Sequence, residues 1–122
     1  MLVLKPTDDK NLIKEYFDKE NIPFSNNSNM LLATDREAVL GYCLFDVDSA
    51  LTIYKIEPLN DIFLLDGVLR STLYVGCERG KTDAFYADTA PEDVFERLGF
   101  VKNKAEKRLN VEKLFESCCG CK

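Results

Sequence analysis

The pattern of apolar and polar residues predicts a strand–helix–strand unit within residues 51–100. Residues 51–57 (LTIYKIE), which end at Pro58, are expected to form a strand. Apolar residues then recur at helical spacing as far as Gly80, and residues 83–88 return to a strand pattern. Two strands joined by a helix in this way lie parallel, with a right-handed crossover.

The same pattern predicts further elements on both sides of this unit. The expected strands are residues 1–5, 30–33, 38–47, 100–102 and roughly 107–111. The expected helices are 7–20 with Thr7 as N-cap, the central helix with Asn60 or Asp61 as N-cap, a short helix capped by Thr89 or Ala90, and a last turn if Asn110 caps it. The predicted fold class is α/β (α+β), with a mixed sheet of six to seven strands, a central βαβ unit and three to four helices. We expect one domain over residues 1–116, followed by a cysteine-rich tail over residues 117–122.

Two residue types inside the expected strands and helices mark close packing. Gly41 interrupts the strand at residues 38–47, which indicates a β-bulge or a close approach of another backbone segment. Cys43 lies in the same strand and Cys77 on the apolar stripe of the central helix, so we expect both as small packed side chains. The polar run FSNNSN at residues 24–29 is expected to be a loop.

Composition removes several classes of function. The chain has 122 residues and a net charge of −5. It therefore lacks the positive electrostatic field that binding to nucleic acids or anionic membranes requires. It has no apolar run of membrane-spanning length and no signal-peptide pattern, so we expect a cytoplasmic protein. It contains no histidine, which removes Ser-His-Asp and Cys-His catalysis and histidine metal ligands.

The motifs VLGYCLF, IYKIEP and DTAPEDVFERLGFV together resemble the GNAT superfamily of acyl-CoA-dependent N-acetyltransferases. VLGYCLF is similar to a core strand of that fold, and IYKIEP followed by a helix ending in ERG is similar to its cofactor-binding segment. The most specific motif is DTAPEDVFERLGFV, which resembles the helix-to-strand signature of the family. The resemblance implies acetyl-CoA or another acyl-CoA as donor and a small-molecule or peptide amine as acceptor. It also leaves a homodimer open.

The resemblance also implies functional positions. Glu57 matches the carboxylate that deprotonates the acceptor amine, and Phe95 stands where the family has its proton-donating tyrosine. Tyr54, Tyr74 and Tyr86 are alternative acids, of which we take Tyr86 as the candidate. The residues expected near the cofactor are Ile56, Asn60, Asp61, Leu65, Gly67, Asp88 and Phe95.

The turn expected to hold the cofactor phosphates departs from the family pattern. The family has glycines where this chain reads NDIFLL, and a Cβ atom obstructs the approach of phosphate oxygens to backbone amides. Asp61 and Asp66 add negative charge, and we expect them to stabilise their own helix. An alternative hypothesis is therefore a binding or interaction module of the same fold that has lost catalysis.

Three cysteines near the C-terminus form a separate feature. Cys118, Cys119 and Cys121 are candidate ligands for zinc or another soft metal such as Cu(I). A tetrahedral site needs a fourth ligand, for which Cys43 and Cys77 are the remaining thiols. Redox-active or acyl-accepting thiols, or a reduced terminus without a role, are the other interpretations.

Overall fold

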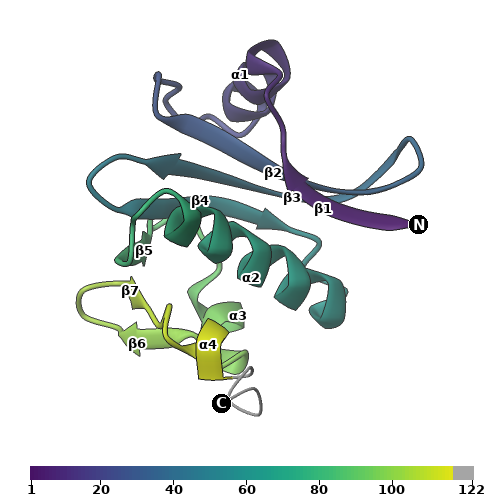
Figure 1. Ribbon diagram of the computed structural model, residues 1–122. Helices are drawn as coiled ribbons and strands as arrows, with labels where there is room; N and C mark the ends of the chain where they lie inside the picture. The colour runs from purple at the N-terminus through teal and green to yellow at the C-terminus, as the bar shows by residue number, and fades with distance from the viewer. Residues whose placement is uncertain (117–122) are drawn as a thin grey trace.

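The structure, a computed structural model, describes residues 1–116 as one seven-stranded mixed sheet with helices on both faces (Figure 1). The strands are β1 (Leu2–Pro6), β2 (Ser28–Asp35), β3 (Ala38–Val47), β4 (Leu51–Glu57), β5 (Ala84–Tyr86), β6 (Val101–Asn103) and β7 (Arg108–Leu109). The helices are α1 (Lys10–Lys19), α2 (Ile62–Glu78), α3 (Glu92–Arg97) and α4 (Lys113–Glu116). The predicted α+β class, strand number and helix number are confirmed.

The strand order β1-β2-β3-β4-β5-β7-β6 places the βαβ unit near the middle of the sheet. β4 and β5 are parallel and joined through α2, as the sequence predicts, and the other neighbouring strands are antiparallel. No helix within residues 1–116 combines the length and the apolar character needed to cross a membrane.

Each face of the sheet carries its own apolar core. On one face α1 buries Ile13 and Phe17 against Met30 and Leu44. On the other face α2 and α3 cover the larger core, whose central members are Leu31, Cys43, Phe45, Ile53, Ile56, Leu65, Leu69 and Phe95. α1 and α2 therefore lie on opposite sides of the sheet (Figure 1).

Helix α1 begins two residues later than expected. Thr7 is wrong as its N-cap, because the Thr7 amide donates to the Met30 carbonyl at 3.1 Å and continues the pairing of β1 with β2. Asp9 caps the helix instead, and its side chain accepts a hydrogen bond from the Leu12 amide at 3.1 Å. β2 starts at Ser28, so the end of the expected polar loop belongs to a strand.

The starts of α2 and α3 differ in how they are capped. Asp61, one of the two expected residues, caps α2 by accepting from the Leu64 amide at 3.1 Å. The expected cap of α3 is wrong, because Pro91 holds the N-cap position and makes no side-chain capping bond. The Thr89 hydroxyl donates to the Tyr54 carbonyl at 2.7 Å instead, which ties the loop before α3 to β4.

β4 leaves β5 part of the way along its length. The parallel register joins Leu51, Thr52 and Ile53 to β5 and goes no further, whereas residues 55–57 pair with β3 alone. A shift in the β3–β4 register leaves Tyr54 as the extra residue of a β-bulge. Residues 55–57, the end of β4, therefore have one edge without a partner strand among the described residues.

Gly41 meets the backbone of β4 closely, as the sequence predicts. A Cβ atom on Gly41 would lie 2.6 Å from the Glu57 carbonyl oxygen and 2.9 Å from Pro58 Cδ. The β2–β3 register also shifts beside it, between Ala33 and Thr34. The glycine thus allows β3 to pass under the turn that leads into α2.

Substitution of Gly41 by alanine is expected to lower the free energy of unfolding by about 1–3 kcal/mol, because backbone atoms cannot yield to the new methyl group. Gly67→Ala is the matched control, because a Cβ there would meet only Leu4 Cδ1 at an ordinary 3.5 Å. In the middle of α2 it is expected to stabilise by about 0.5–1 kcal/mol. Urea unfolding of both variants measures the difference, and equal midpoints would contradict the close approach at Gly41.

Candidate functional site

Glu57 lies at the end of β4 within a polar group that we call the Glu57 cluster, made of Glu20, Tyr42, Lys55 and Glu57. The Lys55 ammonium stands between two carboxylates, 3.4 Å from Glu57 Oε2 and 3.6 Å from Glu20 Oε1. The other Glu57 oxygen accepts from the Leu59 amide at 3.3 Å. The three charged side chains are 22–31% exposed, so each is partly buried and still accessible to solvent.

Tyr42 joins the cluster from β3. It pairs with Glu57 in the β3–β4 register, and its hydroxyl donates to Glu20 Oε2 at 3.0 Å. Burial, the hydrogen bond to Glu20 and the nearby carboxylates raise the pKa of Tyr42. Its ring also meets Tyr16 edge-on, with the centroids 4.9 Å apart. The cluster therefore combines two carboxylates with an aromatic wall on the α1 face of the sheet.

This arrangement is suited to an ammonium group. Lys55 itself occupies the space between the carboxylates, at distances longer than a hydrogen bond, so the ion pairs are loose. Glu20 lies at the C-cap of α1, where the helix ends and turns back toward the sheet. Sequence reasoning missed this residue, and it missed the link to Lys55, because nothing in the chain pattern connects position 20 with position 55.

Tyr86, the candidate acid, lies on the other face of the sheet. Its side chain belongs to the core beneath α2 and α3 and packs edge-on against Phe95, with centroids 5.4 Å apart. Its hydroxyl donates to Glu92 Oε2 at 2.5 Å, and burial followed by this bond raises its pKa. The structure does not bring Tyr86 and Glu57 together.

The residues expected near the cofactor fall into two groups. Ile56, Leu65 and Phe95 are fully buried, so their side chains serve the core. Gly67 lies within α2, and the Asp88 side chain is 90% exposed and ion-paired with Lys107. Asn60 and Asp61 line a surface cavity of about 600 Å³ at the start of α2, and Asp88 lines a smaller cavity of about 110 Å³ elsewhere.

The residues at the start of α2 do not fit a pyrophosphate group. Asp61 already accepts from the Leu64 amide through its side chain and from the Leu65 amide through its carbonyl. Its carboxylate repels an anion, and no lysine or arginine among the described residues lines this cavity. A phosphate at a helix end needs free amides and positive charge. Here the positive charge is missing, and the Asp61 side chain occupies the Leu64 amide.

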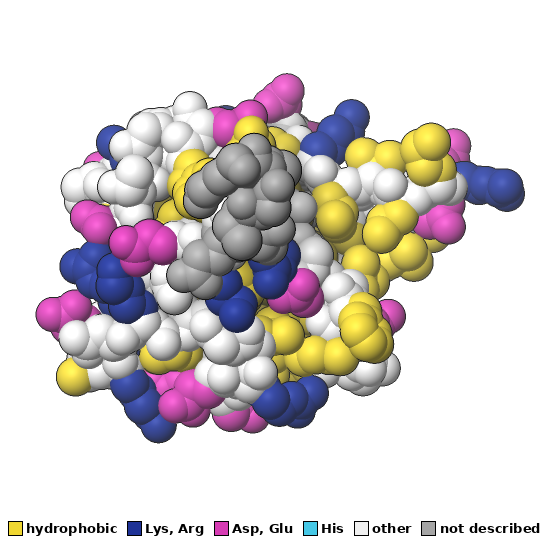
Figure 2. Space-filling view, turned by 60° about the horizontal axis from the view of Figure 1, so that its bottom comes forward, with side chains coloured by type: hydrophobic (Ala, Val, Ile, Leu, Met, Phe, Trp, Pro, Cys, Tyr) yellow, Lys and Arg dark blue, Asp and Glu magenta, His cyan; other side chains and the backbone are white. Residues whose placement is uncertain are grey.

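Apolar side chains surround the same end of the sheet. β1, β3 and α2 all begin there, and we call this surface the end patch: Met1, Leu2, Val39, Leu40, Leu59 and Phe63. Phe63 is the most exposed of these side chains, at 88%. Figure 2 shows hydrophobic side chains gathered along the right-hand side of the molecule, where these elements begin. The surface at the expected phosphate site is thus largely apolar.

A second polar pair lies beneath α1. The Tyr54 hydroxyl donates to Asp46 Oδ2 at 2.7 Å, while Asp46 Oδ1 is buried and has no hydrogen-bond partner in the part of the chain that the structure describes. Tyr54 also meets the ring of Phe17 edge-on. Strand alternation left the direction of Tyr54 open, and the structure points it toward α1, away from Tyr86.

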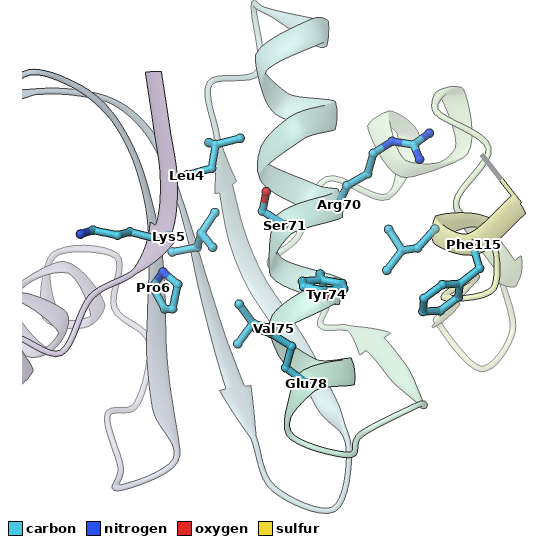
Figure 3. Close-up of a pocket in the computed structure, with 11 residues that line it drawn as sticks. Leu4, Lys5, Pro6, Arg70, Ser71, Tyr74, Val75, Glu78 and Phe115 are labelled. Carbon is cyan, nitrogen blue, oxygen red and sulfur yellow. The ribbon is translucent and has the colours of Figure 1, made fainter. Parts of the chain in front are cut away.

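A groove of about 560 Å³ runs along α2 (Figure 3). Leu4, Lys5 and Pro6 of β1 line one part of it, and Tyr74 and Phe115 line another. Its lining is mostly apolar, and Lys5, Arg70, Ser71, Tyr74 and Glu78 add polar groups to it. Of the thiols in the described residues, Cys43 is buried as expected, whereas Cys77 is only partly buried. The candidate metal ligands Cys118, Cys119 and Cys121 lie outside the described residues.

Comparison with protein-family models, with curated proteins and with solved structures finds no match to this chain.

The stability of the protein is expected to fall as the pH rises from about 10 to about 12. Burial and the hydrogen bond to Asp46 raise the pKa of Tyr54 to about 12, whereas an unfolded tyrosine titrates near 10. Below about pH 10 the stabilisation is complete, and above it the unfolded chain loses a proton that the folded chain keeps. Urea unfolding across this range measures the loss. Tyr54→Phe is expected to reduce this decrease of the unfolding free energy with pH, whereas the control Tyr74→Phe is expected to leave it unchanged. An unchanged pH dependence in Tyr54→Phe would contradict the raised pKa of Tyr54.

Proposed function

We propose that this protein is an N-acyltransferase that acts on a small-molecule or peptide amine. The observation that carries the proposal is the divergence of β4 from β5 after Ile53, which leaves residues 55–57 with a partner strand on one side only. Unpaired backbone groups at a strand edge bind an extended ligand through hydrogen bonds of the sheet type. Glu57, at the end of this segment, supplies a carboxylate beside that edge. The motif resemblance supports the same class of reaction.

The Glu57 cluster supports an amine as the acceptor. Glu20 and Glu57 hold the Lys55 ammonium loosely, so an incoming ammonium of similar size can replace it. Carboxylates orient such a group by charge, and Tyr42 and Tyr16 offer aromatic surface beside it. Glu57 would then take the amine proton, directly or through water, to leave a neutral nucleophile.

The donor implied by the resemblance is an acyl-CoA, and it supplies an activated thioester when bound. The start of α2 does not fit its pyrophosphate, because Asp61 caps the helix and no cation within residues 1–116 lines the cavity. The extended pantetheine arm and its thioester match the unpaired edge of β4 better than the nucleotide matches the helix end. We therefore expect the protein to recognise the donor mainly through contacts with the pantetheine arm.

The first test compares acetyl-CoA with S-acetylpantetheine, which lacks the nucleotide and its phosphates. Both are expected to raise the thermal midpoint to a similar degree, since a ligand at a hundred times its dissociation constant stabilises by about 2.7 kcal/mol. Desulfo-CoA shows whether the nucleotide binds without the thioester. No shift with any of the three at millimolar concentration would sink the proposal.

A second candidate is a binding module of the same fold without catalysis. The specific observation in its favour is the end patch, which surrounds a helix start that is already capped by its own carboxylate. In that case the thioesters would give no thermal shift. Phe63 is the most exposed member of the patch. In that case a Phe63→Ser variant would be the one to weaken association of the protein in solution.

The acceptor assignment is tested with n-butylamine as a primary-amine probe. Lys55→Gln removes the internal competitor and is expected to tighten binding about 1.4- to 5-fold, the range equivalent to an ion pair of 0.2–1 kcal/mol. Glu57→Gln is expected to weaken it. Lys14→Gln, which breaks an exposed pair with Asp18, makes the same charge change elsewhere as a control. Isothermal calorimetry measures the dissociation constant of n-butylamine for each variant. An equal gain in affinity in Lys55→Gln and Lys14→Gln would show that only the net charge matters.

A further inference from the structure

Strand β1 lies at one end of the sheet and has a partner on one side only. It pairs with β2 along its whole length, from Leu2 opposite Asp35 to Pro6 opposite Leu31. Its other edge has no partner strand within residues 1–116. A strand edge of this kind pairs readily with another chain unless it is covered or blocked. β6, at the opposite end of the sheet, has only three residues, so β1 is the longer free edge.

One hydrogen bond at the end of β1 shows which backbone groups face β2. The Thr7 amide donates to the Met30 carbonyl at 3.1 Å and continues the register of the two strands. In an antiparallel pair, the residues that exchange hydrogen bonds alternate with residues that do not. Val3 and Lys5, at even spacing from Thr7, therefore direct their amides and carbonyls toward β2.

The remaining residues of β1 direct their backbone groups away from the sheet. The amides of Leu2 and Leu4 point outward, as do the carbonyls of Leu2, Leu4 and Pro6. Pro6 has no N–H group, and an outward position on an edge strand is where a sheet tolerates proline. The free edge therefore offers donors toward its start and an acceptor alone at its end.

The side chains of β1 divide between the two faces of the sheet. Leu4 packs on the core beneath α2. Since side chains alternate along a strand, Leu2 and Pro6 share the α2 face, whereas Val3 and Lys5 lie on the α1 face. Figure 3 shows Leu4 and Lys5 leaving β1 on opposite sides, with Leu4 directed toward α2.

The two ends of β1 are complementary on the α2 face. At its start, the Leu2 side chain is 48% exposed. At its end, Pro6 lines the groove along α2 together with Tyr74 and Val75 (Figure 3). An exposed leucine and an apolar hollow thus lie at opposite ends of one free edge. A two-fold axis through the middle of β1 brings each leucine onto the hollow of the other copy.

We propose that this chain forms a two-fold homodimer in which β1 pairs antiparallel with β1 of a second copy, centred on Leu4. Leu4 and its counterpart exchange both main-chain hydrogen bonds. The Leu2 amide donates to the Pro6 carbonyl of the other copy, where the missing N–H of proline leaves the acceptor free. The Leu2 side chain enters the groove beside that proline. The contact is isologous, so the pairing closes at two copies.

Charge and size agree with a reversible dimer. In this register Lys5 stands opposite Val3 of the other copy, so the two Lys5 ammonium groups do not oppose each other directly. β1 has five residues, fewer than the roughly 20–30 residues a side of a standard stable interface. We therefore expect a dissociation constant in the micromolar range, with the Leu2 contact contributing much of the affinity.

Sedimentation velocity of the full chain, from low micromolar to millimolar concentration, tests the dimer. The mass is expected to double with concentration. Leu2→Asp is expected to raise the dissociation constant at least about tenfold, because it places a carboxylate in an apolar groove. Leu40→Asp, the matched control, makes the same change at a leucine of similar exposure, 43%, on β3, and is expected to have no effect.

Two outcomes of this experiment would overturn the proposal. One is a monomer at every concentration. The other is equal weakening by Leu2→Asp and Leu40→Asp, which would assign the association to the end patch as a whole. Both leucines are exposed, so neither substitution disturbs the core.

A second measurement uses the unaltered protein and reads the two sides of β1 separately. Hydrogen exchange by NMR is expected to show slower exchange of the Leu4 amide as the concentration rises. The Lys5 amide, which faces β2, is expected to be protected at every concentration. A Leu4 amide that stays unprotected where the dimer forms would place the contact elsewhere. Protection of Leu4 that is independent of concentration would mean that another segment covers the edge, and either result would overturn the proposal.

Discussion

The burial of one face of α2 against the middle of the sheet is the constraint on which the rest of the structure depends. Leu65 and Leu69 of the helix join Ile53 and Ile56 of β4 in a single core, and each fully buried aliphatic side chain contributes about 1.5–3 kcal/mol. Since only residues 58–61 connect β4 to α2, this packing brings the start of the helix to the end of β4. β5 has already left β4 there, so the strand edge and the helix start lie close together.

The same geometry explains why the helix start is a poor site for phosphate. A helix that begins at the surface needs partners for its first amides, and the Asp61 side chain supplies one of them, to the Leu64 amide. This cap stabilises the protein by about 1 kcal/mol, and it places a carboxylate where an anion would bind. Polar chemistry is found on the opposite face of the sheet instead, where Glu57 meets Lys55 and Glu20. Stability of α2 and phosphate recognition at its start are therefore in direct conflict.

How much the sequence predicts depends on the range of the interaction. Local signals give the βαβ unit, the cap at Asp61 and the helix end at Gly80, whose φ of 79° is the left-handed conformation that glycine favours. The faces of β4 are not local. Strict alternation from Leu51 would place Glu57 on the same face as Tyr86, but the bulge at Tyr54 reverses every later side chain. One extra residue thus separates the expected base from the expected acid. Its trace in the sequence is the change of phase after Ile53, where polar Lys55 and apolar Ile56 take the places that strict alternation would reverse.

Helix α2 also determines how the two ends of the molecule influence each other. Its 17 residues span roughly 25 Å between the capped start at Asp61 and the turn that carries Cys77. At that far end, Cys77 of α2 and Leu114 of α4 pack on the same core. The Glu57 cluster draws its members from α1, β3 and β4, on the other face of the sheet. A change at the far end of α2 therefore reaches the cluster only through the packing of α2 on β4, so it should leave amine binding nearly unchanged unless that packing changes.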